Sequence, residues 1–335
     1  MEVVNNKIKF SKIYNELYRK ANGKTFLITG ATGLIGSNLT DFLVDCGAHV
    51  IALARNKEKA KTFKFYNDVN WVFQDIEEPI ILKDHVDYVV HTVSPTSSNY
   101  FVTKPVETIL SGINGLNNIL KFSKDNNVSS VVFTSSMEAY GLCNEDRFLR
   151  EGESFYLNPV NVRNSYPEGK RLQECLCASY SEEFNVPVKI VRLAQTFGEG
   201  VSKDDNRVFN QFARAVLSNK DIVLSSKGET KRSMCSIADS IIGILIALFN
   251  GDNGEIYNVA SDNTYCSIYD MAVRFSKNSK SKIIIEGKED NKYLATIKFG
   301  LDTSKIKDIG FESIDNMDSM IEELLIYIKK YFANI

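Results

Sequence analysis

Two residues four positions apart, Tyr166 and Lys170, could together move a proton. Side chains at positions i and i+4 of a helix lie on the same face. A phenol has an unperturbed pKa of about 10, and a nearby cation favours its phenolate form. We therefore expect Lys170 to bring Tyr166 into acid/base work near neutral pH. The pattern Tyr-x-x-x-Lys occurs by chance in many proteins. The surrounding sequence must therefore show whether this pair is catalytic.

The neighbouring residues predict where the helix that carries this pair begins. Pro167 suits a first-turn position, and Ser165 with Glu168 matches a capping box. A second candidate segment, SSMEAYG, follows the β-branched run 130–134. Ser136 there can hydrogen-bond a reacting oxygen. Glu138 either acts on substrate as a contact or a base, or only anchors its loop.

The glycines of GATGLIG predict a phosphate-binding turn between a strand and a helix. The first glycine permits a tight turn, the second lets the backbone approach a pyrophosphate, and the third allows close helix–strand packing. Free N–H groups at the helix N-terminus then face the phosphates. A plain turn is the alternative, and the strand–turn–helix context argues against it. The predicted dinucleotide contacts in this turn are Gly30, Thr32, Gly33, Leu34, Ile35 and Gly36.

The end of the second predicted strand bears on which dinucleotide is bound. An acidic residue there would bind the ribose 2′-hydroxyl of NAD, but this chain has Ala54 followed by Arg55. A small residue and an arginine suit a 2′-phosphate, which favours NADP over NAD. The alternative is that Arg55 is only a solvated surface charge. Asp75 and Ile76, after a third strand, either contact the adenine or form a bare strand end.

Short β-branched runs alternate with helical stretches over the first part of the chain, which predicts an α/β fold with a Rossmann-type, doubly wound parallel sheet. The runs lie at 25–29, 50–54, 88–91, 130–134 and 188–192, and the helices at 36–46, 105–126 and 167–184. We predict an N-terminal helical appendage over residues 1–22, with one amphipathic helix over residues 8–20, and an NAD(P)-binding domain over residues 23–195.

Beyond residue 195 the alternation of strands and helices becomes irregular. Residues 196–335 are predicted to form mainly a smaller C-terminal α/β substrate-binding lobe, partly interleaved with the Rossmann domain. The helices expected there lie at 208–217, 236–250 and 311–332.

The composition of the chain limits the classes of binding partner that we expect. The 335 residues carry 40 Lys and Arg against 42 Asp and Glu, so neither nucleic acid nor an acidic membrane is expected as the main partner. The longest apolar run, residues 241–249, is far below the roughly 20 residues that span a bilayer. The first residues lack a signal-peptide core, so a cytoplasmic location is expected. The six Cys and three His have no metal-ligand spacing, so no metal site is expected.

Together, the segments TGATGLIGSNL, HTVSP, SSMEAYG, SYPEGKR and RLAQTFG resemble the extended short-chain dehydrogenase/reductase family that modifies nucleotide-activated sugars. The resemblance covers roughly residues 23–330. It implies that Ser136, Tyr166 and Lys170 carry catalysis, and that His91, Thr92 and Lys170 border the cofactor. It also implies a homodimer through the helices near 105–125 and 167–184. The implied substrate contacts are Gln195, Arg207, Val208, Leu224 and Arg232. Of these, Arg232 is implied to bind the nucleotide diphosphate.

The resemblance leaves the reaction open. The main hypothesis is an NAD(P)-dependent epimerase/dehydratase-type enzyme that uses Tyr-Lys acid/base chemistry and transfers a hydride at a sugar hydroxyl or keto carbon, with C4 as the expected position. The alternatives are an NADPH-dependent reductase of a nucleotide-linked keto sugar and a catalytically silent, cofactor-binding regulatory protein. Met137 stands where sugar 4,6-dehydratases have an acid. Glu199-Gly200 replaces the Pro-Arg of uronic acid decarboxylases, which argues against their way of binding a carboxylate.

Overall fold

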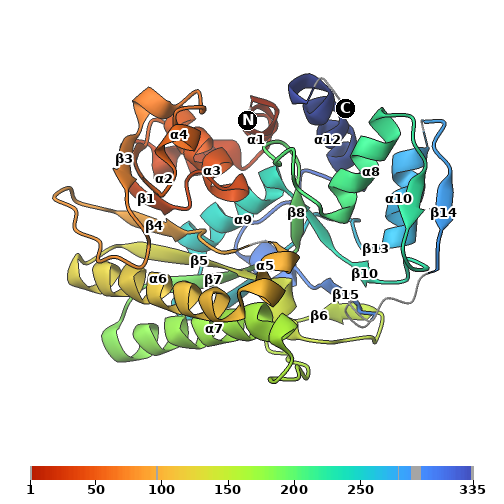
Figure 1. Cartoon of the computed structure of the whole chain (residues 1–335). Helices are drawn as coiled ribbons and strands as arrows, with labels where there is room; N and C mark the ends of the chain where they lie inside the picture. The colour runs from red at the N-terminus through yellow and green to blue at the C-terminus, as the bar shows by residue number, and fades with distance from the viewer. Residues whose placement is uncertain (1, 96, 278, 288–295, 333–335) are drawn as a thin grey trace.

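A seven-stranded parallel sheet forms the centre of the computed structural model, which describes residues 2–95, 97–277, 279–287 and 296–332 (Figure 1). The strand order is β12-β7-β5-β4-β1-β2-β3, and every neighbouring pair is parallel. The strands are β1 (Thr25–Thr29), β2 (His49–Ala54), β3 (Asn70–Phe73), β4 (Tyr88–His91), β5 (Ser130–Ser136), β7 (Val188–Leu193) and β12 (Ile256–Val259).

Helices cover both faces of this sheet, which is why its central strands are apolar along nearly their whole length. One face packs against α3 (Leu34–Asp45) and α9 (Ile237–Asn250) in one hydrophobic cluster. The other face packs against α6 (Pro105–Asp125) and α7 (Ser165–Phe184) in a second cluster. Figure 1 shows α6 and α7 side by side on their face of the sheet. The predicted doubly wound Rossmann-type fold is therefore confirmed.

The N-terminal segment differs from its prediction, because it forms two helices instead of one helix over residues 8–20. These are α1 (Glu2–Lys9) and α2 (Tyr14–Ala21). The Ser11 hydroxyl and amide both donate to the carbonyl of Ile8, which closes the first helix before the second begins. In α2, Leu17 is fully buried and Tyr18 is 40% exposed.

A smaller lobe lies at the carboxyl edge of the main sheet. Its hydrophobic core is shared by α8 (Val208–Leu217), α10 (Ile268–Ser276) and α12 (Met317–Tyr331). The predicted helix over residues 311–332 starts later than expected, because Asn316 caps α12 and Phe311 is buried in the segment before it. The chain crosses between the two parts, since α9 and β12 follow α8 in sequence and pack with the main sheet.

Short strands complete the smaller lobe. A four-stranded sheet has the order β13-β10-β15-β6, and two further pairs join β11 to β8 and β14 to β9. These strands are β6 (Arg147–Leu149), β8 (Gln195–Phe197), β9 (Ile222–Leu224), β10 (Lys231–Arg232), β11 (Met234–Ser236), β13 (Cys266–Ser267), β14 (Ile283–Ile285) and β15 (Lys298–Leu301).

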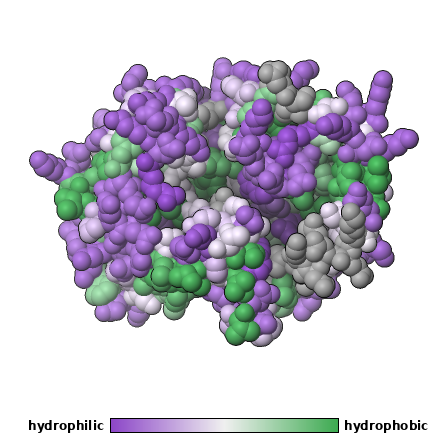
Figure 2. All heavy atoms as spheres, in the orientation of Figure 1, coloured by the Kyte–Doolittle hydropathy of each residue, from purple (hydrophilic) through white to green (hydrophobic). Residues whose placement is uncertain are grey.

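The remaining elements are short helices: α4 (Lys57–Ala60), η1 (Tyr66–Asp68), α5 (Ser98–Thr103), η2 (Met137–Tyr140), η3 (Val162–Asn164) and α11 (Ser304–Asp308). Among the helices in the described part of the chain, none is long and apolar enough to cross a bilayer. Figure 2 shows a largely hydrophilic surface that is hollowed between the two parts of the molecule.

Candidate active site

The glycine turn between β1 and α3 has the geometry that its spacing predicts. Gly30 has a φ of +71°, and its N–H donates to the Leu53 carbonyl at 3.1 Å. A Cβ at Gly36 would lie 2.3 Å from the Gly30 carbonyl oxygen, so only glycine fits. The Ser37 N–H closes the first helical bond, to the Gly33 carbonyl at 3.0 Å. The backbone amides of residues 34–36 come before Ser37, in the first turn of the helix. A turn with such amides fits a dinucleotide pyrophosphate.

Thr92 and His91 support this turn from the neighbouring strand β4. The Thr92 hydroxyl donates to the Thr29 carbonyl at 2.7 Å and lies against Gly30 and Gly36. His91 is 1% exposed, and its Nδ1 lies 2.8 Å from the Thr29 hydroxyl. Burial, and the charge of Lys170 second, lower the His91 pKa to about 3. The neutral His91 ring is therefore buried in the core, and its place beside the cofactor stays a prediction.

The ends of β2 and β3 bring Arg55 and Asp75 together. Their side chains approach to 3.6 Å between Nη1 and Oδ2, and the Arg55 side chain is 77% exposed. Ala54 is buried at the end of β2, so no carboxylate stands there. Ile76 is 5% exposed and packs against Gly115 of α6, and a contact of Asp75 or Ile76 with the adenine stays a prediction.

Tyr166 and Lys170 both lie on α7, facing the carboxyl end of β5. Lys170 is buried, and its Nζ donates to the Thr134 carbonyl at 2.9 Å. Burial lowers the Lys170 pKa to about 8, against the opposing charge of Glu174. The Lys170 Nζ lies 5.8 Å from the centre of the Tyr166 ring, so the two side chains share a site as predicted from their spacing.

Burial is the main influence on the electrostatics of Tyr166. Burial raises the pKa of this phenol to about 12, and the charge of Glu138 acts in the same direction. The hydroxyls of Ser136 and Ser94 and the charge of Arg163 oppose that rise. The expectation that Lys170 brings the phenol towards neutral titration stays a prediction, and the burial of Tyr166 opposes it. Burial disfavours the charged phenolate form, which is the main reason for the raised pKa.

The start of α7 also differs from its prediction. The helix begins at Ser165, and Asn164 at its N-cap makes no side-chain capping bond. The Ser165 hydroxyl donates to the Phe101 carbonyl at 3.1 Å, and Glu168 lies beside Arg171 at 3.8 Å. The predicted capping box is therefore wrong, because both of its side chains have partners elsewhere.

Ser136 and Glu138 reach Tyr166 from the end of β5. The Ser136 hydroxyl accepts the Glu138 N–H at 3.2 Å, and Glu138 Oε2 lies 3.2 Å from Arg163 Nη2. The sequence did not single out Arg163 or Ser94. Arg163 lies three residues before Tyr166, a helical spacing that could have marked it as a neighbour. Ser94 follows β4 in the HTVSP segment and carries no separate signal.

Arg232 and Gln195 present unpaired polar groups on the smaller lobe. No described residue accepts a hydrogen bond from Arg232 Nε, and no described residue donates to Gln195 Oε1, although both atoms are buried. Burial lowers the Arg232 pKa, which the charge of Glu138 opposes. The pairing of β8 with β11 places Gln195 opposite Met234, two residues after Arg232. A buried guanidinium nitrogen without an acceptor is suited to an anionic ligand.

Three predicted substrate residues, Arg207, Val208 and Leu224, have partners within the protein. Asp205 binds the Arg207 guanidinium through Nη2–Oδ2 at 2.6 Å and Nε–Oδ1 at 3.1 Å, so the charge of Arg207 is paired within the protein. Leu224 is 5% exposed in the hydrophobic core of the smaller lobe, and Val208 packs against the same core. Contacts of these three residues with substrate stay predictions.

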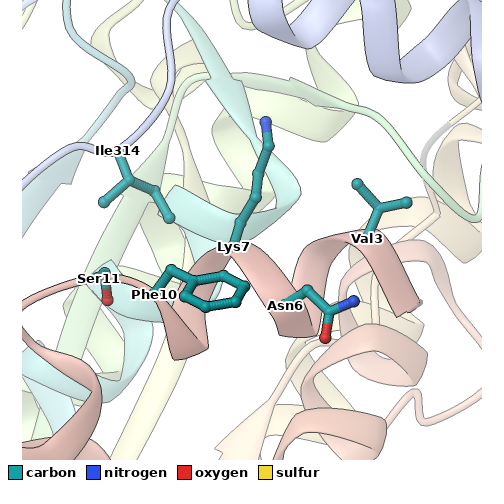
Figure 3. Close-up of a pocket in the computed structure, with 6 residues that line it drawn as sticks. All are labelled: Val3, Asn6, Lys7, Phe10, Ser11 and Ile314. Carbon is teal, nitrogen blue, oxygen red and sulfur yellow. The ribbon is translucent and has the colours of Figure 1, made fainter.

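One surface pocket lies outside this constellation of residues. It has a volume of about 420 Å³ and is formed by α1 and the segment before α12 (Figure 3). Its lining residues are Val3, Asn6, Lys7, Phe10, Ser11 and Ile314, none of which belongs to the predicted site. Within the described residues, no group of three or more His, Cys, Asp or Glu side chains is placed to hold a metal ion.

The chain is similar to known proteins in sequence and in fold. A UDP-glucuronic acid decarboxylase 3 from Arabidopsis thaliana is 29% identical over 237 residues, covering 69% of this chain and 68% of that protein. The structure of UDP-glucuronic acid 4-epimerase from Bacillus cereus in complex with NAD is 21% identical, with a TM-score of 0.74 and coverage of 92% of this chain and 99% of that one.

A UDP-N-acetylglucosamine 4-epimerase from Methanobrevibacter ruminantium M1, in complex with UDP-N-acetylmuramic acid, is 24% identical. Its TM-score is 0.79, with coverage of 94% of this chain and 100% of that one. These structural matches establish the shared fold. Residues 26–260, most of the Rossmann-type core, match the family itself. The chain therefore belongs to the NAD dependent epimerase/dehydratase family, in its extended short-chain dehydrogenase/reductase group of nucleotide-sugar enzymes.

Proposed function

We propose that this protein oxidises and re-reduces a hydroxyl-bearing carbon, C4, of a UDP-linked sugar, with Tyr166 as the acid/base group. The observation that carries the proposal is the convergence of Tyr166 with Ser136, Glu138 and Lys170. The relatives named above include a UDP-glucuronic acid decarboxylase and UDP-sugar 4-epimerases, which supports UDP as the nucleotide.

Each side chain in this proposal has a distinct task. The nicotinamide cofactor, when bound, supplies hydride acceptance and return. Tyr166 takes the hydroxyl proton at its phenolic oxygen as the sugar carbon becomes a carbonyl, and returns it when the carbonyl is reduced. Ser136 hydrogen-bonds the reacting oxygen. Lys170 holds a positive charge behind the phenol, and Arg232 binds the diphosphate, an assignment that its unpaired Nε supports.

A product assay tests this function and separates it from the reductase alternative. The protein is mixed with NAD, NADP or NADPH and a panel of UDP-sugars that includes UDP-glucose and UDP-glucuronic acid. An epimerase returns its hydride to the same substrate, so we expect a new sugar isomer by NMR without net change in cofactor absorbance. Stoichiometric loss of NADPH absorbance with a keto sugar would support the reductase instead. No product with any UDP-sugar would contradict the proposal.

We infer that the preferred cofactor is NADP. Arg55 is exposed at the end of β2 without a neighbouring carboxylate on that strand, and its pair with Asp75 is exposed and therefore weak. Arg55→Ala should weaken NADPH binding about 10- to 100-fold, which is the loss of one charged hydrogen bond of about 1.5–3 kcal/mol. NADH binding should stay unchanged. Fluorescence titration measures both, and a wild-type protein that binds NADH more tightly than NADPH would contradict this inference.

We further propose that α6 and α7 form a homodimer interface. Val106, Leu110 and Leu172 on these helices are each at least half exposed, at 61%, 50% and 50%. Figure 2 shows hydrophobic groups on the side of the molecule where Figure 1 places α6 and α7. The double variant Leu110→Glu with Leu172→Glu should halve the molar mass measured by light scattering, because it buries charges in the interface. A monomeric wild-type protein would refute the dimer.

A further inference from the structure

The Tyr166 ring is held by a phenylalanine from a different segment of the chain. Phe101 belongs to α5, which lies in the crossover between β4 and α6. The centres of the Phe101 and Tyr166 rings are 4.3 Å apart, and their planes differ by 9°. Phe101 is only 2% exposed, so its ring position is set by the surrounding protein. The contact therefore restricts the rotation of the phenol.

A hydrogen bond joins the same two segments through the backbone. The Ser165 hydroxyl donates to the carbonyl oxygen of Phe101 at 3.1 Å. Ser165 is the first residue of α7 and directly precedes Tyr166. A displacement of α5 therefore breaks this bond or moves the start of the helix that carries Tyr166.

Arg163 connects this stack to Glu138. Its Cζ lies 5.1 Å from the centre of the Phe101 ring, within the range of a cation–π contact. Its Nη2 lies 3.2 Å from Glu138 Oε2, and the two side chains are 15% and 27% exposed. Its Nη1 is buried, and no described residue accepts a hydrogen bond from it. One guanidinium thus contacts both the ring beside Tyr166 and the carboxylate of Glu138.

We propose that Phe101 and Arg163 are positioning residues that hold the Tyr166 phenol and the Glu138 carboxylate at a set separation. This inference rests on the proposed role of Tyr166. A tyrosine side chain has two rotatable bonds, and a reacting group displaced by about 1 Å can lose about 100-fold in rate. The stack on Phe101 fixes the phenol, and the guanidinium of Arg163 ties the carboxylate to the same ring. Neither residue has to touch the substrate to act in this way.

The variants Phe101→Leu, Arg163→Met and their combination test this unit. Each single variant should lower kcat about 10- to 100-fold, the cost of a misplaced reacting group. The KM for the UDP-sugar should change by less than about threefold, because ground-state binding is untouched. The combined variant should lose about as much as the worse single variant, since both residues act through one ring.

Matched controls separate positioning from a structural effect. Phe122 of α6 is 5% exposed and lies in a hydrophobic cluster that includes neither Tyr166 nor Phe101, so Phe122→Leu should lower the Tm without lowering kcat. Equal losses of kcat in Phe122→Leu and Phe101→Leu would overturn the proposal. Arg163→Met provides the same test without removing a core ring, should Phe101→Leu fail to fold.

Tyr166→Phe in the same series distinguishes this inference from the proposed function. If Tyr166→Phe keeps full activity, the proposed acid/base role of Tyr166 is wrong. The positioning role of Phe101 and Arg163 is then wrong as well. If Tyr166→Phe is inactive while Phe101→Leu and Arg163→Met keep the wild-type kcat, the function stands and the positioning role alone is overturned.

Discussion

Tyr166→Phe is expected to lower kcat by about 10²- to 10⁴-fold, the usual contribution of a positioned acid/base group. The substitution removes only the hydroxyl that would exchange a proton with the sugar. The ring would still stack on Phe101 at 4.3 Å, so the local packing should persist. Binding of NADPH should stay within about twofold, because the glycine turn is a separate element. Steady-state turnover of a UDP-sugar and fluorescence titration of NADPH measure the two effects.

Tyr180→Phe is the matched control on the same helix. Its hydroxyl donates to Asn117 Oδ1 of α6 at 2.7 Å, and the sequence and the structure give it no place in the site. Removing that bond should lower stability by about 1 kcal/mol and leave kcat unchanged. A Tyr166→Phe protein that keeps more than about a tenth of wild-type turnover would contradict acid/base catalysis by this phenol.

Glu174→Ala is expected to cost about 3–5 kcal/mol of unfolding free energy, because it leaves a buried guanidinium without its partner. Glu174 on α7 accepts from Arg192 Nε at 2.9 Å and Nη2 at 2.7 Å, and from the Ser135 hydroxyl at 2.5 Å. The side chains of Glu174 and Arg192 are each 7% exposed. This network fastens the helix of Tyr166 and Lys170 to β5 and β7. Urea unfolding of the wild-type and variant proteins measures the loss.

Two further variants separate the buried pair from an ordinary surface pair. Glu174→Leu combined with Arg192→Met should cost less than Glu174→Ala alone, because it removes both charges together. Glu58→Ala removes an exposed partner of Lys61 and should leave the urea midpoint unchanged. A Glu174→Ala protein as stable as the wild type would show that the network does not hold α7 in place.

Much of the fold was predictable because the sequence patterns that indicate it involve residues close together in the chain. The β-branched run 25–29 coincides with β1, and the run 88–91 coincides with β4. Gly30 adopts the positive φ that a tight turn requires, and no Cβ fits at Gly36. In such cases the conformation depends on residues adjacent in the chain, so the pattern predicts it. The candidate pair Tyr166 and Lys170 was recognised for the same reason, since i and i+4 share a helix face.

The sequence was a poor guide where the neighbours of a residue come from distant segments of the chain. Residues 8–20 were predicted to form one helix, but the turn at Ser11 divides them between α1 and α2. Leu224 is buried in the core of the smaller lobe, which its neighbours in the sequence do not indicate. Ser165 matched a capping motif, and its hydroxyl instead binds the carbonyl of Phe101. None of these partners can be identified from neighbouring sequence.

The sequence by itself therefore determined the order of strands and helices, the glycine turn and the residue types of the candidate site. Tertiary structure alone decided what surrounds those residues. Burial and Glu138 raise the Tyr166 pKa to about 12, although the sequence pairs this phenol with a lysine. Packing of α5 against α7 placed Phe101 beside Tyr166, and Arg163 beside Phe101. Local conformation follows from adjacent residues, whereas desolvation and side-chain contacts depend on segments that only folding brings together.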